Sequence, residues 1–379
     1  IRVRLLGEDL IAFRTSDGSV GLVDAYCPHR RAPLFFGRAE ECGIRCAYHG
    51  WKFNKDGDCI EMPSEPEDTP LIHRVKIKSY PTVERGGVIW AYMGPKDQQP
   101  PPPNFEWLRA PETHRWVSKT FEHCNYLQAM EGGLDTAHSS FAHNNRIGDT
   151  TELRNRDGRP RIEVEPTDYG YWYSSTRSVA PNQNYIRLYH FVMPNQQVRG
   201  AYRAPDGSLA EVPKQDGHLW VPIDDETTFV YNWACSYDAS IPLTKEFMIK
   251  FETFAGRGPD DLIPGTFKLK RNPSNDYLID RKLQKNTMTG IVGLNTQDFA
   301  LQEGMGPIVD RSLEFLGTSD RAIVVMRRLM LEAIAAVERG EKPRGVDPSA
   351  SSHIRAHDDL LPVDVSWRDA FRDHLKAKW

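Results

Sequence analysis

Short runs in which apolar and polar positions alternate dominate the first hundred residues. The run 11–15 leads into the polar turn 16–19 and the run 20–23, a pattern typical of a β-hairpin with Asp-Gly at its tip. Residues 53–60 repeat the pattern, and 88–93 form a short apolar run that favours a strand. The pattern predicts a small all-β module at the start of the chain.

A run of four prolines at 100–103 interrupts this pattern. Proline lacks the backbone N–H that a sheet needs and fixes φ, so the run is expected to be a stiff connection. A chain of 379 residues is also long enough for two cores. We therefore expect an all-β domain over residues 1–103 and a larger domain over 104–379.

The pattern beyond the prolines is mixed. Residues from about 121 to 139 are expected to be helical, and 171–177 and 185–193 are predicted strands of a second, larger sheet. A polar N-cap at 318–320 precedes apolar residues at helical spacing, and Gly340 ends that run. The sequence thus predicts an α+β domain with an antiparallel sheet.

Composition adds mainly exclusions. The net charge of −4 gives no electrostatic reason to expect nucleic acid or an anionic membrane as partner. No apolar run approaches the roughly 18 residues that span a bilayer, and no signal-peptide pattern opens the chain. Because Ile1 lies inside a predicted strand, we expect the natural protein to begin further upstream.

Six cysteines in so long a chain do not make a disulfide scaffold, so a reducing cytoplasm is the expected compartment. Four of them lie in neither a Cys-x-His nor a Cys-x-x-His motif and are expected to be ordinary small buried side chains. These four are Cys42, Cys59, Cys124 and Cys235.

The other two cysteines each stand close to a histidine. Cys27 is followed two positions later by His29, and Cys46 is followed three positions later by His49. Two thiolates and two imidazoles suit a metal of borderline softness, and a structural zinc site is one alternative. Zinc fingers, however, usually pair cysteine with cysteine. A Rieske [2Fe–2S] centre places two cysteines on one iron and two histidines on the other, which two mixed loops can supply.

A second group of candidate residues lies in the expected helix. Asp135 and His138 would lie one turn apart on the same helical face. His143 does not share that face, so a common metal would need a distortion or a helix end near Ser139. By itself, an aspartate and a histidine on one face are more often a solvated or hydrogen-bonded pair.

These segments resemble the Rieske non-heme iron oxygenases, and the resemblance covers nearly the whole chain. Arg30 follows the first histidine and Gly50-Trp51 follows the second, as in the cluster loops of that family. The stretch 135–143 resembles its iron-binding stretch. Residues 200–217 match no pattern. Three further stretches look like the phthalate dioxygenase and phenoxybenzoate dioxygenase branch: 61–65, 125–128 and 310–317.

The resemblance implies two cofactors, a Rieske [2Fe–2S] cluster and a mononuclear Fe(II). The implied cluster ligands are Cys27 and Cys46 on one iron and His29 and His49 on the other. The implied ligands of the mononuclear iron are His138, His143 and Asp298.

By the same resemblance Asp135 is a catalytic residue without being a ligand. It would link a cluster histidine to an iron histidine across neighbouring subunits. The third iron ligand is expected in the stretch 297–303, at Asp298. The other carboxylates considered, Glu303, Asp310 and Asp320, are expected to serve helix ends or the surface.

The resemblance implies an enzyme with an N-terminal Rieske domain and a catalytic domain of helix-grip type. The implied activity is hydroxylation of an aromatic carboxylic acid, with dioxygen and with electrons from a separate flavin and iron–sulfur reductase. The implied assembly is a homotrimer or stacked trimers. Two alternatives stay open: an O-demethylating monooxygenase on the same scaffold, and a Rieske electron carrier without catalysis.

Two arginines among aromatic residues are candidates to hold a substrate carboxylate. Arg177 shares a strand face with Tyr171 and Tyr173, and Arg187 shares one with Tyr189. For each, stacking on a tyrosine or pairing with an acid is the favoured interpretation.

Overall fold

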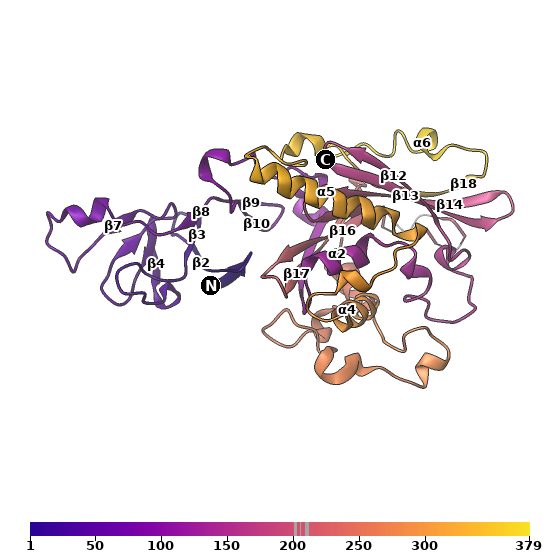
Figure 1. The fold of residues 1–379 in the computed structure, drawn as a ribbon, viewed down its shortest axis with the longest axis horizontal. Coiled ribbons are helices and arrows are strands. Elements are labelled where there is room, and N and C mark those ends of the chain that lie inside the picture. The colour runs from indigo at the N-terminus through magenta and orange to yellow at the C-terminus, as the bar shows by residue number, and fades with distance from the viewer. Residues whose placement is uncertain (201–202, 205, 209–211) are drawn as a thin grey trace. The chain divides into compact units, whose positions relative to one another are not determined.

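The computed structural model describes residues 1–200, 203–204, 206–208 and 212–379. The chain divides into two compact units, Ile1–Pro102 and Pro103–Trp379 (Figure 1), and the division falls within the proline run. The stretch 200–217, in which no family pattern is recognisable, lies partly outside the described residues.

The first unit consists of short antiparallel strands in three sheets. One sheet has the order β1-β2-β3-β8, the second has the order β4-β5-β6-β7, and β9 pairs with β10. The predicted hairpin β2–β3, the hairpin β6–β7 and the strand β10 are confirmed. The strands are β1 Arg2–Leu5, β2 Glu8–Arg14, β3 Val20–Asp24, β4 Arg38–Glu40, β5 Gly43–Arg45, β6 Lys52–Phe53, β7 Cys59–Glu61, β8 Ser79–Tyr80, β9 Thr82–Arg85 and β10 Val88–Ala91.

The core of this unit lies between the two four-stranded sheets and includes Cys27, Cys46 and Cys59. Cys124 and Cys235 are buried in the second unit, as expected. The expectation for Cys42 is wrong, because this residue is exposed. It lies in the tight turn between β4 and β5 with a φ of 62°, and such turns face solvent.

The second unit is built on one antiparallel sheet with the order β11-β17-β16-β15-β14-β13-β12. The strand β18 pairs with the first half of β14, and β15 pairs with its second half. The predicted strands 171–177 and 185–193 are confirmed as β13 and β14. The strands are β11 Arg115–Glu122, β12 Arg161–Thr167, β13 Gly170–Ala180, β14 Gln183–Val192, β15 Gln196–Arg199, β16 Lys214–Pro222, β17 Thr228–Ser236 and β18 Asp358–Pro362.

Helices cover this sheet, as predicted. On one face, α2 packs on β16 and β17, α4 packs on α2, and α5 lies along β12 and β13 (Figure 1). The predicted C-terminal helix is confirmed as α5, and Gly340 after it has a φ of 73°. Within the described residues, no helix is both long and apolar enough to cross a bilayer. The helices are α1 Glu106–Arg109, α2 Tyr126–Leu134, α3 Lys245–Phe254, α4 Leu294–Gly304, α5 Arg321–Glu338 and α6 Trp367–Ala370.

The prediction of one helix over 121–139 is wrong at both ends. Residues 121 and 122 end the strand β11, and α2 begins only after the Asn125 side chain accepts a hydrogen bond from the N–H of Leu127. The helix ends at Leu134 because the Asp135 carboxylate accepts the N–H groups of the next turn. A separate 3-10 turn follows at His138–Ser140.

Two glycines allow α2 to lie very close to its neighbours. A Cβ on Gly132 would stand 1.9 Å from the Nε2 of Gln302 on α4, and one on Gly133 would stand 2.1 Å from the Trp220 ring on β16. A larger residue at Gly133 would push the helix away from the Trp220 ring, and one at Gly132 would displace the Gln302 side chain. The end of α2 is thereby fixed between α4 and β16, and the segment after it carries the candidate residues.

Candidate metal centres

The two cysteine–histidine loops of the first unit close in the same way. In one, the N–H of Cys27 donates to the oxygen of Ala32 at 2.9 Å, and the N–H of Arg31 donates to the oxygen of Cys27 at 2.9 Å. In the other, the N–H of Cys46 donates to the backbone oxygen of Trp51 at 2.8 Å, and the N–H of Gly50 donates to the backbone oxygen of Cys46 at 3.0 Å. The sequence spacing therefore produces two matching turns, each holding one cysteine and one histidine.

Each turn needs a left-handed residue at its fifth position. Arg31 has a φ of 58°, and Gly50 has a φ of 78°. A Cβ on Gly50 would also stand 2.6 Å from the Cγ of Pro63. The second loop thus requires glycine both for its backbone conformation and for space.

The side chains of these loops converge. The rings of His29 and His49 have centroids 4.5 Å apart, and His29 stacks on Trp51 at 4.4 Å. Trp51 is itself anchored, because its Nε1 donates to the Oγ of Ser64 at 3.0 Å. The structure therefore brings the predicted cluster residues of both loops together.

The buried polar atoms of this group fit a metal cluster. The Nδ1 of His29 has no hydrogen-bond partner among the described residues. Burial and the neighbouring thiol of Cys46 raise the pKa of Cys27 to about 12, against the lowering effect of the His29 N–H. Two buried thiols become thiolates only when a positive charge lies between them, and an unpartnered imidazole nitrogen beside them is a ready ligand.

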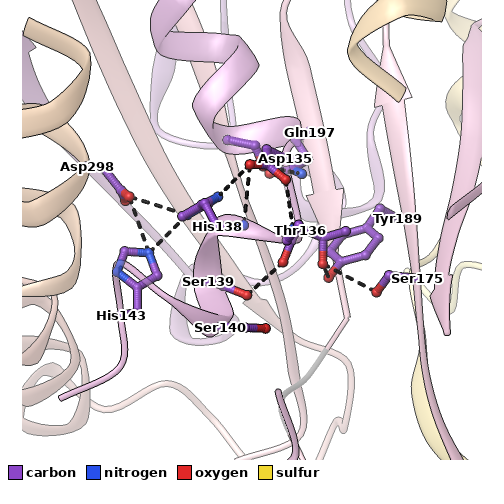
Figure 2. A network of polar contacts seen from close by, with 12 residues as sticks. Asp135, Thr136, His138, Ser139, Ser140, His143, Ser175, Tyr189, Gln197 and Asp298 are labelled. Atoms are coloured by element: carbon purple, nitrogen blue, oxygen red, sulfur yellow. Dashed lines mark hydrogen bonds and ion pairs between the residues drawn. The ribbon is translucent and has the colours of Figure 1, made fainter. Parts of the chain in front are cut away.

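The second centre lies in the larger unit and joins two distant segments (Figure 2). The Oδ1 of Asp298, on α4, lies 3.4 Å from the Nε2 of His138 and 3.2 Å from the Nε2 of His143. The two Nε2 atoms are 3.1 Å apart. Among the described residues, these three are the group whose ligand atoms gather closely enough to hold a metal ion.

The electrostatics of this trio favour a bound cation. Burial alone would raise the pKa of Asp298, but the two imidazoles hold it well below its usual range. Burial alone would lower the pKa of His138, but the carboxylates of Asp135 and Asp298 raise it to about 10. An ionised carboxylate and two imidazoles pointing at one spot match the two-histidine, one-carboxylate set of non-heme Fe(II) oxygenases.

Two further side chains orient these ligands, and the sequence analysis did not single them out. The Oε1 of Gln297 lies 2.8 Å from the Nδ1 of His143, which leaves the Nε2 of His143 to face the metal position. Asn295 donates to the Oδ2 of Asp298 at 3.3 Å and accepts a hydrogen bond from Arg257. Both lie within three positions of Asp298, but a glutamine or an asparagine beside a candidate ligand does not by itself indicate an orienting role.

Asp135 contacts His138, but not as a helical neighbour. It is the C-cap of α2 in an extended conformation, so the expected same-face arrangement is wrong. Its carboxylate accepts the N–H of Ala137 at 2.7 Å and that of His138 at 3.3 Å. In this turn its Oδ2 stands 3.7 Å from the Nδ1 of His138 (Figure 2). Asp135 therefore lies behind the ring of His138, on the side opposite Asp298.

The other carboxylates considered lie away from the trio. Asp310 and Asp320 serve the helix ends expected of them, because they accept the N–H groups of Ser312 and Gly317. The expectation for Glu303 is wrong. It is partly buried. Its carboxylate accepts a hydrogen bond from the backbone N–H of His123 at 2.8 Å and another from the hydroxyl of Tyr277.

A cavity opens beside the trio and includes part of the sheet in its wall. His138, His143, Asp298 and Asp135 line it together with α2 and α4 side chains. The wall from the sheet consists of Arg187, Tyr189, Arg199, His218, Trp220 and Val230, with Glu122 at its edge. A small organic molecule in this cavity would therefore lie against the metal position.

The structure separates the two arginine candidates. Arg177 is buried and donates to the backbone oxygen of Thr136 at 2.7 Å, so it supports the turn before His138. Arg187 does line the cavity, but its Nε donates to Asp358 at 2.7 Å and its guanidinium lies over Tyr189. Pairing with an acid and stacking on a tyrosine is the interpretation the sequence favoured for Arg187, and it is confirmed.

Two family models match the chain. Residues 1–81 match the Rieske [2Fe–2S] domain, and residues 91–377 match the LigXa C-terminal domain like model. The solved structure of dicamba monooxygenase bound to dicamba superposes with a TM-score of 0.62 at 20% identity, over 90% of this chain and 94% of that one. The predicted fold, a β Rieske domain before an antiparallel sheet with helices, is thus confirmed.

Two relatives align over nearly the full chain. The phthalate 4,5-dioxygenase oxygenase subunit of Pseudomonas putida is 39% identical over 97% of this chain and 85% of its own length. The 5,5'-dehydrodivanillate O-demethylase oxygenase subunit of Sphingobium sp. (strain NBRC 103272 / SYK-6) is 31% identical over 99% and 80%. With both domains and nearly the whole length of a relative matched, the chain belongs to the Rieske non-heme iron oxygenases, as a catalytic α subunit with a [2Fe–2S] cluster and a mononuclear iron.

Proposed function

We propose that this protein is the oxygenase component of an aromatic ring-hydroxylating dioxygenase that acts on an aromatic carboxylic acid. The observation that carries the proposal is the convergence of His138, His143 and Asp298 at the wall of a cavity. When bound there, the iron supplies the activation of dioxygen. The cavity holds the ring of the substrate against that position.

The residues divide between two tasks in this proposal. Residues 1–103 hold the cluster through Cys27, His29, Cys46 and His49, and residues 104–379 hold the iron through His138, His143 and Asp298. Gln297 and Asn295 keep the iron ligands oriented. Asp135 orients His138 and provides the link toward the cluster of a neighbouring subunit.

The proposed partners follow from this division. Electrons come from a separate flavin and iron–sulfur reductase, a proposal supported by the two relatives, each of which is named as the oxygenase subunit of its enzyme. The proposed assembly is a homotrimer or a stack of trimers in the cytoplasm. An electron carrier without catalysis is disfavoured, because it has no use for the trio at the cavity.

Two features support an aromatic acid as substrate. The cavity is lined by the aromatic rings of Tyr189 and Trp220, and Arg199 places a cation in the same wall. The relative at 39% identity is named for the oxidation of phthalate, an aromatic dicarboxylate. The alternative of O-demethylation rests on the relative at 31% identity, whose metal ligands would be the same.

Labelled dioxygen is expected to enter the substrate in a single turnover. Iron-replete, reduced protein is mixed with aromatic acids, with and without methoxy groups, and the products are read by mass spectrometry. A cis-diol with both labelled atoms is the expected result, since a ring dioxygenase adds both oxygens. Formaldehyde together with a phenol would replace the proposal by the demethylase, and no product from any acid would contradict the substrate class.

Gln297→Leu is expected to weaken iron binding roughly 10- to 100-fold, the usual effect of removing an outer-shell partner. The variant removes the acceptor that holds His143 by its Nδ1. Iron content after dialysis against a graded series of chelator concentrations measures the change. Gln284→Leu is the control, because Gln284 instead accepts a hydrogen bond from Arg281, away from the trio. Equal iron retention in the two variants would contradict the orienting role.

A further inference from the structure

Two buried histidines on the central sheet differ in their hydrogen bonding. The ring of His190, on β14, is used on both sides: its Nδ1 lies 2.7 Å from the hydroxyl of Tyr169, and its Nε2 lies 3.0 Å from the backbone oxygen of Arg355. The Nδ1 of His218, on β16, is buried without a hydrogen-bond partner among the described residues. A buried polar atom without a partner is costly, so a fold that retains one calls for an explanation.

His218 lies where a ligand could supply that partner. Its side chain lines the catalytic cavity together with His138, His143 and Asp298, although it is only 4% exposed. His190 is equally buried but does not line the cavity. Of the two imidazoles, that of His218 therefore lies at the wall of the cavity in which a substrate would bind.

The cross-strand neighbours of His218 are committed elsewhere. Gln197 lies opposite it on β15, and its Nε2 donates to the hydroxyl of Tyr173 at 2.6 Å and to the backbone oxygen of Gly133 at 2.8 Å. Asn232 lies opposite on β17 and donates to the Oγ of Ser118 at 3.3 Å. The Oε1 of Gln197 also lacks a partner among the described residues, so a competing role for His218 is to support Gln197.

A group of charged side chains with a surplus cation lies beside His218 on β16. Asp216 lies on the same face of β16. Its carboxylate forms ion pairs with the Nε of Arg199 at 2.9 Å and with the Nζ of Lys214 at 2.6 Å. Two cations and one carboxylate leave a formal charge of +1 in this group, and Arg199 itself lines the cavity. Burial and Arg199 lower the pKa of His218 well below its usual value, so the ring is neutral and can donate one N–H.

We propose that His218 is a specificity-determining residue whose imidazole hydrogen-bonds the carboxylate of the aromatic substrate. Arg199, which lines the cavity with His218 and is bound to Asp216 on the same strand face, places a cation beside the imidazole. This inference rests on the proposed function and deepens it. It gives the acid group a defined place and thereby fixes which edge of the ring faces the iron ligands.

Phthalate binding tests this role directly. Dissociation constants are measured by isothermal titration calorimetry on the intact, iron-loaded protein without reductant, for phthalate and for its uncharged dimethyl ester. His218→Phe keeps the ring shape but removes both nitrogens, and phthalate binding is expected to weaken about 10- to 100-fold, as for a lost hydrogen bond to a charged group. Binding of the ester is expected to change much less. His218→Gln, which can still donate, is expected to recover most of the affinity.

Two further variants separate this role from a structural one. His190→Phe is the matched control: it is expected to lower the melting temperature because it leaves Tyr169 and Arg355 without a partner, and to leave phthalate affinity unchanged. Gln197→Leu tests the competing role. If His218→Phe and Gln197→Leu both lower the melting temperature while phthalate affinity stays at the wild-type value, the inference is overturned. If wild-type protein binds neither phthalate nor any other aromatic acid, the proposed function fails together with it.

Discussion

Asp298→Ala is expected to abolish retention of the mononuclear iron and all product formation, while the [2Fe–2S] cluster stays in place. Asp298 is the one carboxylate of the trio, and its Oδ1 faces both Nε2 atoms at 3.2–3.4 Å. Its removal leaves two imidazoles without a negative charge between them. Iron affinity should fall by more than the roughly 100-fold that loss of an outer-shell partner can cause. Iron per chain, with the visible absorption of the cluster as internal reference, measures the result.

The control for this variant is Asp310→Ala. Asp310 lies in the segment after α4 and caps a short 3-10 turn, because it accepts a hydrogen bond from the N–H of Ser312 at 3.0 Å. Its loss should leave the iron content unchanged and lower stability only by the small amount typical of a lost cap. Full iron occupancy in Asp298→Ala would remove Asp298 from the ligand set. Loss of cluster absorption as well would indicate a folding defect and not a lost ligand.

The cluster loops were predictable because their information is local. A cysteine and a histidine two or three positions apart lie in one turn, and the glycine that closes the second turn follows its histidine directly. No long-range contact is needed to recognise such a loop. The hairpins of the first unit were predictable for the same reason, since their turn residues stand between the paired strands.

The environment of the iron was only partly predictable. The spacing of Asp135 and His138 indicated a contact, but the helical reason was wrong, because the Asp135 carboxylate itself ends α2 by accepting the next N–H groups. Local helix propensity does not reveal that competition. Gln297 acquires its role only when α4 packs beside α2, over 150 positions from His143 in sequence.

The cavity wall was the least predictable part. Arg187 is buried on β14, and the acid that it pairs with, Asp358, begins β18, a strand that the sequence analysis did not identify. His218 lies on β16 in a run of consecutively buried residues, and this run gives no sign of whether the partner of His218 is protein or ligand. Such roles depend on which side chains the sheet order places in one row, and that order is a property of the whole fold.

Asp135→Asn is expected to cut product formation by about 100-fold or more with both metals still bound, the size of effect seen when one preorganised charged partner is lost at a reacting centre. Asparagine keeps an oxygen that can accept the N–H of Ala137, so the turn after α2 should survive. It removes the negative charge 3.7 Å from the Nδ1 of His138. Stopped-flow absorption, which follows reoxidation of the reduced cluster in the presence of substrate and dioxygen, separates slow electron delivery from weak binding.

Asp347→Asn is the matched control for this change, because Asp347 accepts the N–H of Ser349 in the same kind of turn on the exposed surface. That variant should turn over at the wild-type rate. In Asp135→Asn, iron and cluster contents equal to wild type with slow cluster reoxidation would support a role of Asp135 between the two centres. Normal reoxidation and normal product formation would contradict that role, since the contact of Asp135 with His138 would then serve only to shape the turn.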